Sequence, residues 1–298
     1  MQIAANGISI EVDDQGPPGG PPLLLIMGLG MQLTAWPDEL VQMLVARGHR
    51  VIRIDNRDAG LSQGFESAGT PNLAGVVLRY FLHLPVPAPY TLADMANDAI
   101  GVLDALGIAK AHVCGASMGG MIAQHIAATQ PDRVSRLTLM MTTSGGRRLP
   151  QASVKVRAAL LERRASAAHD IDSEVARLMR LFTLIGSPAY RPDPEAFKSR
   201  LTASVRRAWR PSGVVRQIVA VVADGDRTPL LARIRAPTHI VHGADDPLVP
   251  VAAAHDLHAK IAGSTLEVID GMGHDLPAPL WPRFAEAMAR STPDRGNT

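Results

Sequence analysis

Short apolar runs alternate with amphipathic helical patterns along most of this chain, and this alternation limits the fold more than any other feature. Strand-like runs lie at 8–12, 23–27, 50–55, 111–115, 134–141, 236–243 and 264–270. Helical patterns separate most of them, as at 37–47, 91–106 and 251–262. Strands that alternate with helices form mainly parallel sheets with helices on both faces. We therefore predict an α/β fold built on a mostly parallel sheet.

The alternation stops near residue 147 and resumes near residue 233. Between these points the sequence shows helical patterns near 153–167, 171–185, 195–209 and 212–223, without a convincing strand pattern. A helical insertion between two consecutive parts of one sheet explains this interruption most simply. We therefore expect residues 1–147 and 233–298 to form one α/β core, and residues 148–232 to form a helical cap.

The composition suits a soluble globular chain with a large core. Of 298 residues, 46% are hydrophobic and 19% are charged, and the formal net charge is +2. This balance favours neither nucleic acid nor a membrane surface as a partner. The sequence has no run of 18 apolar residues and no signal-peptide pattern at its start, so we expect a cytoplasmic location. Cys114 is the single cysteine, which excludes an intrachain disulfide, and its apolar neighbours favour a buried thiol.

Residues 113–122 read VCGASMGGMI and place Ser117 in a G-x-S-x-G pattern. A strand-like run precedes Ser117 and an apolar helical pattern follows it, so the serine lies at the carboxyl end of a strand, where α/β sheets bind ligands. Gly115 and Gly119 lack Cβ atoms, which relieves crowding in a sharp strand-to-helix turn. We expect this turn to hold Ser117 in an uncommon backbone conformation, with its hydroxyl beside the N–H groups of a helix N-terminus.

A serine hydroxyl is a weak nucleophile alone, so it needs a base, and ten histidines are available. His125 lies eight residues further along the helix, about 12 Å away. His239 and His242 are an odd number of residues apart in one strand and point to opposite faces. His255 and His258 are close enough on a helix to share a metal ion. Because no third ligand is evident, we interpret them as part of a solvated helix face and predict no metal site.

His274 differs because it lies in a glycine-rich turn, DGMGHDLP, directly after the strand-like run STLEVID. The preceding strand-like run ends in HGADDPLVP, which places Asp245 and Asp246 at its carboxyl end. Asp246 fits the pattern G-x-x-D-x-x-x-P and is our choice for the orienting carboxylate, whereas Asp245 is expected to face away or to cap the next helix. The chain order Ser117, Asp246, His274 is that of α/β-hydrolase triads. We predict these three residues as the catalytic residues.

Several further stretches resemble the α/β-hydrolase superfamily over essentially the whole chain: LLLIMGLGMQLTAW, VIRIDNRDAGLSQG, TLADMANDAIGVLDALGI, GASMGGMIAQ, GADDPLVP and GMGH. Within it, the chain resembles the bacterial carboxylesterases and methylesterases, a branch that includes the aclacinomycin methylesterase-type esterases. The resemblance implies an α/β-hydrolase fold with a mostly parallel, eight-stranded type of sheet and an inserted helical cap. It also implies a small-molecule ester as substrate, no metal or organic cofactor, and a monomer or homodimer.

The resemblance further implies that the backbone N–H groups of Leu29 and Met118 form the oxyanion hole. Met118 follows the serine at the start of a helix, and glycines flank Leu29 in a loop that can bring its N–H close. One departure from the family is Met27 before the first glycine, where histidine is usual. Residues 55–60, DNRDAG, resemble the family's D-x-R-x-x-G turn, which we interpret as structural, with Arg57 paired locally.

Two segments are expected to shape the substrate site. Residues 148–232 hold 13 Arg, 2 Lys and 8 acidic residues, a net charge of +7. This charge would attract anionic substrates, but we favour a solvated outer face on the cap helices. Residues 63–90 include the apolar stretch LAGVVLRYFLHLPVP, which either lines an entrance or packs as a plain helix on the cap. Five methionines suggest an adaptable apolar pocket: Met27, Met31, Met118, Met121 and Met272.

These residues predict a serine hydrolase that cleaves carboxylic esters through an acyl-enzyme, with short- to medium-chain or broad-range substrates. Ser117 argues against haloalkane dehalogenases and epoxide hydrolases, which use an aspartate at the nucleophile position. Carbon–carbon bond hydrolases, thioesterases and acyltransferases use the same triad and stay open as alternatives. A ligand receptor on the same scaffold is an alternative of a different class. Labelling of Ser117 by a fluorophosphonate together with ester turnover distinguishes an enzyme from a receptor.

Overall fold

A computed structural model describes residues 1–162 and 170–289, and its centre is an eight-stranded sheet. The strand order is β1-β2-β4-β3-β5-β6-β7-β8. The pairs β1–β2 and β2–β4 are antiparallel, and all other neighbouring strands are parallel. The strands are β1 (Gln2–Ala5), β2 (Ile8–Gln15), β3 (Pro22–Ile26), β4 (Arg50–Ile54), β5 (Ala111–Ala116), β6 (Val134–Met140), β7 (Thr238–Gly243) and β8 (Thr265–Ile269). The predicted mostly parallel sheet is confirmed.

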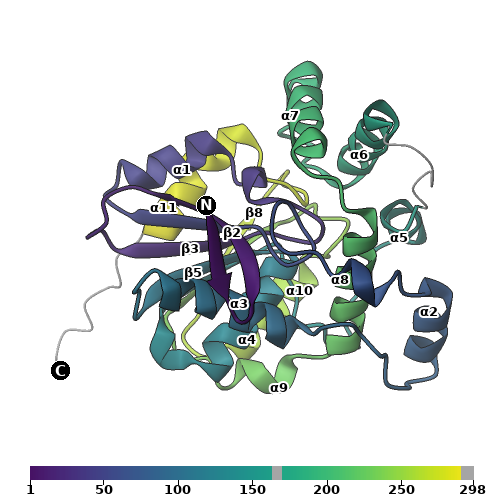
Figure 1. The fold of residues 1–298 in the computed structure, drawn as a ribbon, viewed down its shortest axis with the longest axis horizontal. Coiled ribbons are helices and arrows are strands. Elements are labelled where there is room, and N and C mark those ends of the chain that lie inside the picture. The colour runs from purple at the N-terminus through teal and green to yellow at the C-terminus, as the bar shows by residue number, and fades with distance from the viewer. Residues whose placement is uncertain (163–169, 290–298) are drawn as a thin grey trace.

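Helices cover both faces of this sheet (Figure 1). Helices α1 (Asp38–Val45) and α11 (Trp281–Ala289) pack on one face. Helices α3 (Leu92–Ala105), α4 (Met118–Thr129) and α10 (Ala252–Lys260) pack on the other. A capping box begins α3, because Thr91 Oγ1 accepts from the Asp94 N–H and the Asp94 carboxylate accepts from the Thr91 N–H.

The inner strands are buried on both faces, which explains why they read as continuous apolar runs. In β3, Leu23 and Leu25 pack toward α1 and α11, whereas Leu24 and Ile26 pack toward α3 and α4. Successive side chains of a strand point to opposite faces, so a strand covered on both sides needs an apolar residue at every position. This packing makes β3 and its neighbours the rigid base on which the site is built.

One strand was not predicted from the sequence. β1 pairs with β2 through a tight hairpin, with Ala5 opposite Ile8. Asn6 and Gly7 form the turn, and both adopt left-handed conformations, with φ of 49° and 76°. An Asn-Gly pair is the usual signature of this two-residue hairpin turn, so the signal was present in the sequence.

The order in which the chain adds strands to the sheet changes direction at β3. From β3 the chain runs to β4 on one side, and the next strand, β5, lies on the other side of β3. Ile26 of β3 is paired with Gly115 of β5, so the loops that leave both strands begin side by side. Ligand sites in open α/β sheets lie at the carboxyl ends of strands at such a switch point. Ser117 and Gly28 follow these two strand ends.

Between β6 and β7 the described residues contain helices and no strand. These helices are α5 (Val154–Leu160), α6 (Ile171–Ile185), α7 (Pro194–Arg207), α8 (Pro211–Asp224) and α9 (Thr228–Leu231). Helices α5 to α8 agree with the predicted helical patterns, apart from positions 163–167, which lie outside the described residues. The short helix α9 was not predicted. Helix α2 (Leu73–Phe81) precedes them in the chain and packs against α8. Figure 1 shows α2, α5, α6, α7 and α8 together on the right, beyond the end of the sheet.

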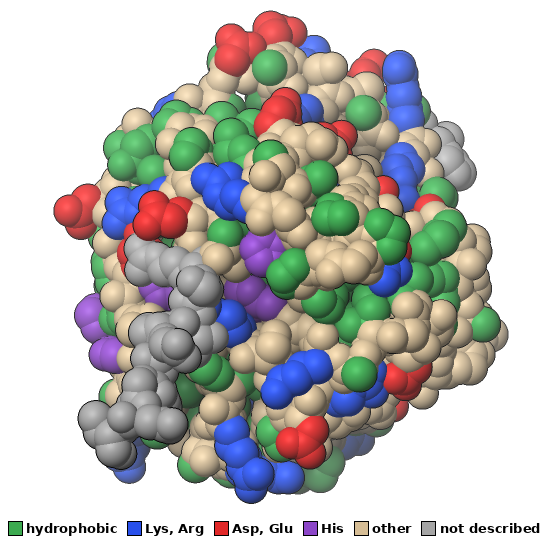
Figure 2. Space-filling view, turned by 90° about the vertical axis from the view of Figure 1, so that its left-hand side faces the viewer, with side chains coloured by type: hydrophobic (Ala, Val, Ile, Leu, Met, Phe, Trp, Pro, Cys, Tyr) green, Lys and Arg blue, Asp and Glu red, His purple; other side chains and the backbone are tan. Residues whose placement is uncertain are grey.

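The surface on the opposite side carries dispersed charge. Figure 2 shows Lys and Arg side chains interspersed with acidic, apolar and histidine side chains over this face. Such mixing agrees with the formal net charge of +2. Within residues 1–162 and 170–289, no helix combines the length and apolarity that crossing a membrane requires.

Candidate active site

Ser117 lies in a strained turn between β5 and α4. Its backbone angles are φ 55° and ψ −120°, a combination that residues with a side chain rarely adopt. A Cβ atom on Gly115 would lie 2.2 Å from the Gly119 carbonyl oxygen, and one on Gly119 would lie 2.1 Å from the carbonyl oxygen of Ile26. The turn is therefore too tight for any side chain at these two positions, as we expected from the sequence.

Hydrogen bonds to the main chain hold Ser117 in this conformation. Its N–H donates to the Met140 carbonyl at 2.9 Å, which ties the turn to the end of β6. Its carbonyl oxygen accepts from the Thr142 hydroxyl at 2.7 Å. The serine side chain is thus free of any structural bond to its own helix and points out of the sheet edge toward His274.

His274 joins Ser117 to Asp246 in a continuous chain of hydrogen bonds. His274 Nε2 lies 3.0 Å from Ser117 Oγ, and His274 Nδ1 lies 2.7 Å from Asp246 Oδ2. An ionised carboxylate only accepts hydrogen bonds, so Nδ1 carries the proton. Nε2 is then left with its lone pair toward the serine hydroxyl. This is the arrangement that a general base for Ser117 requires.

The carboxylate of Asp246 is fixed before it meets the histidine. Asp246 Oδ1 accepts from the N–H groups of Leu248 and Val249 at 2.9 and 2.8 Å, and the side chain is fully buried. His242 lies behind it, with Nε2 donating to the Val249 carbonyl at 2.8 Å and standing 3.5 Å from Asp246 Oδ2. Burial lowers the pKa of His242, which keeps its ring neutral beside the carboxylate.

Asp245 faces away from His274, which is the first of the two alternatives expected for it. Its carboxylate accepts from the Gly271 N–H at 2.9 Å, and its own N–H donates to the Met272 carbonyl at 3.0 Å. Asp245 is exposed and therefore joins the loop after β7 to the loop after β8 rather than capping α10. The structure thus brings Asp246, and not Asp245, to His274.

The end of α6 holds the backbone around His274, which the sequence did not reveal. The His274 N–H donates to the Ile185 carbonyl at 2.7 Å, and the Gly273 N–H donates to Ser187 Oγ at 2.9 Å. The Ser187 hydroxyl and N–H both donate to Asp275 Oδ1, at 2.5 and 3.1 Å. Burial raises the pKa of Asp275, while the bonds from Ser187 oppose this rise. The only sequence signal for this contact was an aspartate directly after the histidine.

The loop after β3 lies against the serine. A Cβ atom on Gly28 would lie 3.0 Å from Ser117 Cβ, so this loop passes within contact distance of Ser117. Asn56 Nδ2 donates to the Met27 carbonyl at 2.8 Å and fixes the start of the loop. Among the described residues, the backbone N–H groups of Leu29 and Met118 have no hydrogen-bond acceptor. Both predicted oxyanion donors therefore lie in segments adjoining Ser117, with unused N–H groups.

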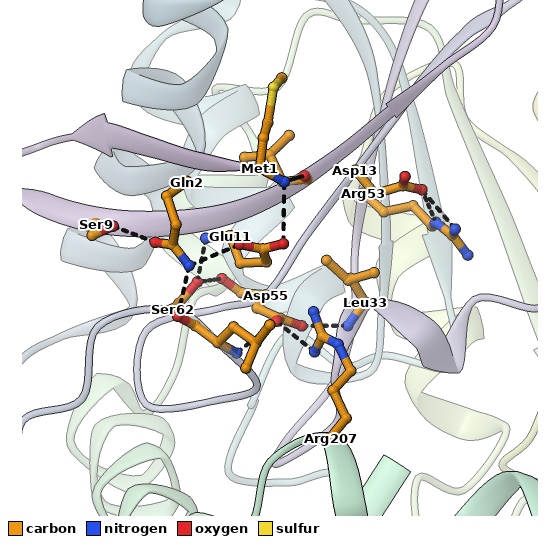
Figure 3. A network of polar contacts seen from close by, with 12 residues as sticks. Met1, Gln2, Ser9, Glu11, Asp13, Leu33, Arg53, Asp55, Ser62 and Arg207 are labelled. Atoms are coloured by element: carbon orange, nitrogen blue, oxygen red, sulfur yellow. Dashed lines mark hydrogen bonds and ion pairs between the residues drawn. The ribbon is translucent and has the colours of Figure 1, made fainter. Parts of the chain in front are cut away.

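The turn after β4 bonds to several distant parts of the chain. Arg57 does not pair locally, contrary to our expectation. Its guanidinium forms two hydrogen bonds with the Asp98 carboxylate on α3, at 2.6 and 2.7 Å. Asp55 accepts from the Leu33 N–H at 2.6 Å and from Arg207 of α7 at 2.8 Å, as Figure 3 shows. The turn thus links three separate parts of the chain because its carboxylates and guanidinium are buried and each needs a partner.

Asp58, in the same turn, meets Arg216 of α8 in a doubly bonded pair. Both oxygens of Asp58 accept from Arg216 at 2.7 Å, and the side chains are 0% and 1% exposed. Burial pushes the pKa of Asp58 upward, but the bonds from Arg216, the Phe65 N–H and the Tyr90 hydroxyl outweigh it and leave the pKa below its ordinary value. The prediction that the cap arginines form a solvated outer face is therefore wrong for Arg216 and Arg207.

A cavity of about 1620 Å³ lies beside the turn that carries Ser117. Ser117 and His274 lie in its wall, together with side chains of α6, α7 and α8. Leu73, Val76 and Phe81 place α2 at this wall as well. Residues 63–90 therefore do both things that the sequence left open: α2 packs on α8 and also lines the cavity.

The cavity wall is mainly apolar and contains several methionines. The methionines in the wall are Met27, Met31, Met118, Met121 and Met141. The expectation for Met272 is wrong, because this residue is fully buried in the core beside α11. Met141, which follows β6, lines the cavity and was not among the predicted methionines.

Histidines outside the Ser117–His274–Asp246 chain of hydrogen bonds have other partners. His125 pairs with Asp224 at 2.8 Å, and His239 lies 3.0 Å from Glu267 on the neighbouring strand. His258 lies 3.0 Å from the Ser264 hydroxyl. Across the part of the chain that the structure describes, no group of three or more His, Cys, Asp or Glu side chains is arranged to hold a metal ion. Cys114 is buried, and burial raises the pKa of its thiol.

Comparison with known proteins agrees with this geometry. Residues 21–277 match the model of the alpha/beta hydrolase fold family. Rhodomycin D methylesterase DauP of Streptomyces sp. (strain C5) is 29% identical to this chain, and the match covers 97% of both proteins. 2-Hydroxymuconate semialdehyde hydrolase of Pseudomonas sp. (strain CF600) is also 29% identical, and the match covers 92% of this chain and 86% of that protein. The structure of the esterase EaEST from Exiguobacterium antarcticum matches with a TM-score of 0.73 at 23% identity, and covers 97% of each chain. This chain belongs to the alpha/beta hydrolase fold family.

Proposed function

We propose that this protein is a serine hydrolase that cleaves carboxylic esters, with Ser117, His274 and Asp246 as its catalytic residues. The observation that carries the proposal is the unbroken chain of hydrogen bonds from Asp246 through His274 to Ser117 at the wall of a large cavity. Similarity to a methylesterase over 97% of both chains supports an ester as the substrate.

In the first half of the reaction, Ser117 Oγ attacks the ester carbonyl carbon while His274 Nε2 removes the hydroxyl proton. The carbonyl oxygen gains the electron pair and becomes an oxyanion, which the N–H groups of Leu29 and Met118 stabilise. Collapse of this tetrahedral intermediate breaks the bond to the alcohol oxygen. His274 gives its proton to that oxygen, and the acyl group stays on Ser117.

In the second half, water replaces the alcohol. His274 Nε2 removes a proton from the water molecule, whose oxygen attacks the acyl carbon. The second tetrahedral intermediate collapses, Ser117 Oγ takes the proton back, and the carboxylic acid leaves. Throughout both halves, the negative charge of Asp246 stabilises the imidazolium form of His274 and holds its Nδ1 proton in place.

The cavity supports a broad range of esters. Its volume of about 1620 Å³ exceeds the roughly 300–1,000 Å³ that is usual for small-molecule sites. Apolar side chains of α2 and flexible methionines such as Met31 and Met121 form much of its wall. We propose that short- and medium-chain esters are accepted and that bulkier esters also fit.

We further propose that residues 148–232 act as a cap over a core formed by residues 1–147 and 233–298. Helices α6, α7 and α8 supply one side of the cavity, while Ser117 and His274 lie on the other. The pairs of Arg207 with Asp55 and Arg216 with Asp58 support a cap that is docked on the core. A monomer or homodimer in the cytoplasm is part of this proposal.

Carbon–carbon bond hydrolysis is the second candidate, because 2-hydroxymuconate semialdehyde hydrolase matches 92% of this chain. The experiment that tests both is a panel of p-nitrophenyl and alkyl esters of graded acyl length, amino-acid amides, and a vinylogous diketone. We expect turnover of the esters, a preference within the short to medium range, and loss of turnover in Ser117→Ala. A clear preference for the diketone would favour the second candidate, and a preference for the amides would contradict ester hydrolysis.

A further inference from the structure

The loop that carries Leu29 donates a hydrogen bond to one side chain of the inserted helices. Gln217 of α8 accepts from the Gly30 N–H through Oε1 at 2.8 Å. Its Nε2 donates to the Arg57 carbonyl at 2.8 Å. Gln217 is fully buried, and the helix around it reads VVRQIVAVV, so a glutamine stands where an apolar side chain would be expected.

These two bonds allow the amide of Gln217 only one orientation. The Gly30 N–H can only donate, and the Arg57 carbonyl can only accept. The amide oxygen must therefore face the loop after β3, and the amide nitrogen must face the turn after β4. Gln217 thereby fixes the distance between the two segments, and Asn56 in the second segment also donates to Met27 in the first.

The loop needs such a restraint because glycines flank Leu29. Gly28 admits no Cβ without crowding Ser117, and Gly30 has a left-handed φ of 67°. The Met31 N–H donates to the Gly28 carbonyl at 3.2 Å and closes a turn around Leu29 and Gly30, but glycines at positions 28 and 30 still allow the adjoining peptide planes a wider range of angles than other residues would. Since the Gly30 N–H belongs to the peptide plane that follows Leu29, its bond to Gln217 limits the rotation that would turn the Leu29 N–H away from the serine.

Other contacts to the loop do not replace this bond. Val214 of α8 packs against Gly30, where a Cβ atom would lie 2.7 Å from Val214 Cγ2. Gln32 Nε2 donates to the carbonyls of Ser204 and Ala208 at 2.7 and 3.0 Å, but it lies three residues beyond Leu29. The packing limits the position of the loop, and the bond from Met31 to Gly28 closes its turn. The Gln217 bond is the contact from the inserted helices that restrains the peptide plane between Leu29 and Gly30.

We propose that Gln217 is a positioning residue for ester hydrolysis, which orients the Leu29 N–H toward the oxyanion. This inference rests on the proposed function and extends it, because it places one determinant of transition-state stabilisation in the inserted helices. Gln217 touches neither the substrate nor the reacting atoms. It acts through Gly30 on the direction of one N–H group.

Two substitutions separate positioning from general stability. Gln217→Met keeps the size of the side chain and removes both hydrogen bonds, whereas Gln217→Glu keeps an acceptor for the Gly30 N–H. A buried carboxylate is expected to lower the Tm of Gln217→Glu below that of Gln217→Met. We expect the order of activity to be the reverse: Gln217→Met lowers kcat by about 10- to 100-fold with KM changed little, and Gln217→Glu keeps most of the activity.

The readout that a structural role would not change is affinity for a trifluoromethyl ketone, whose hemiketal oxygen occupies the oxyanion hole. For Gln217→Met, we expect the inhibition constant to rise by the same factor as kcat/KM falls. Gln124→Met is the matched control, because Gln124 is also fully buried and bonds to the Thr143 carbonyl and to Arg227, away from this loop. This control should lose stability without losing inhibitor affinity.

The outcomes distinguish a failure of the positioning role of Gln217 from a failure of the proposed ester hydrolysis. Unchanged inhibitor affinity in Gln217→Met, or activities that simply follow Tm across the three variants, would overturn the positioning role while leaving ester hydrolysis intact. Absence of ester turnover by the wild-type protein would instead overturn the proposed function. If Gln217→Glu does not fold, the inhibitor affinity of Gln217→Met still decides.

Discussion

His274 presents its two ring nitrogens to different partners, and this asymmetry determines what each neighbour does. The bond from Nδ1 to Asp246 fixes the tautomer, and the lone pair on Nε2 then faces Ser117. Asp246 owes its orientation to two backbone N–H donors in its own loop. Exposed Asp245 next to it bonds to backbone groups of the loop after β8.

The two adjacent aspartates should therefore differ sharply when each is changed to asparagine. Asn at position 246 can donate to Nδ1, which stabilises the wrong histidine tautomer, so we expect Asp246→Asn to lower kcat on the order of 10³–10⁴-fold. Asn at position 245 still accepts from the Gly271 N–H, so we expect Asp245→Asn to stay within about threefold of wild type. Steady-state ester hydrolysis measures both, and a larger loss in Asp245→Asn would contradict the assignment.

The sequence predicted the three triad positions because each follows a strand-like run, and parallel strands end at one edge of a sheet. It did not predict Ser187 and Asp275, which hold the loop that carries His274, or Gln217, which holds the loop after β3. Their contacts join residues that are far apart in the chain, such as Ser187 with Asp275 and Gln217 with Gly30. Such contacts depend on how the inserted helices dock on the rest of the chain. The residue pattern within one segment does not predict this docking.

At the level of elements, the close packing of the turn between β5 and α4 places Ser117 at the edge of the sheet, where it is partly exposed. The peptide backbones of Gly115 and Gly119 are in contact, and that of Gly119 also meets Ile26 of β3. The strand, the helix and the neighbouring loop therefore meet without intervening side chains. This contact sets the separation between Ser117 and the loop after β3.

Two glycine-to-alanine substitutions should have opposite effects on stability. In Gly115→Ala the new Cβ would lie 2.2 Å from a backbone oxygen, so we expect destabilisation of more than about 2 kcal/mol. Gly75 lies in α2 with no atom closer than 3.9 Å to an added Cβ, so Gly75→Ala should be neutral or stabilising by up to about 1 kcal/mol. Urea unfolding compares them, and equal effects would contradict the steric account.

The elements themselves were largely predictable, and the exceptions have physical reasons. The buried strands carry unbroken apolar runs, and α3 begins with a capping box. β1 escaped prediction because its four residues are too few to show a period, although Asn6 and Gly7 mark the hairpin. Arg57 pairs with Asp98, 41 residues away, which a local interpretation of its turn could not anticipate.

At the scale of the whole molecule, the inserted helices meet the core through charged side chains that water scarcely reaches. Asp58 and Arg216 are almost fully buried, and Asp55 is 0% exposed beneath Arg207. The net charge of +7 in residues 148–232 was visible in the sequence, but the positions of its acidic partners were not. The division into core and cap stays a prediction.

Acid stability gives a test at this scale, because β5 carries a buried histidine. Burial, and then the charge of Arg136, lowers the pKa of His112 to about 3. In the unfolded chain the His112 imidazole takes up a proton below a pH of about 6.5, whereas in the folded protein it does so only near 3. The contribution of neutral His112 to the free energy of unfolding is therefore fully present above pH 6.5 and is lost as pH decreases through this window. We expect His112→Gln to remove a few kcal/mol of that pH dependence.

Urea unfolding at a series of pH values from 7 to 4 measures this effect. Exposed His255 provides the matched control, and His255→Gln should leave the pH dependence close to wild type. If the wild-type and His112→Gln stabilities stay parallel across the whole series, His112 does not contribute to acid unfolding. The same series compares the enzymes in one set of buffers, so shifts common to all variants cancel.

The central claim is that Ser117 carries the acyl group during ester hydrolysis, and mass spectrometry of the protein during turnover tests it most directly. The protein is mixed with p-nitrophenyl butyrate, quenched with acid within the steady state, digested and sequenced. We predict one butyryl group per chain, located on the peptide that contains Ser117 and absent in Ser117→Ala, which should also lose turnover. Steady turnover without any butyrylated peptide, or with the group on another residue, would contradict the account.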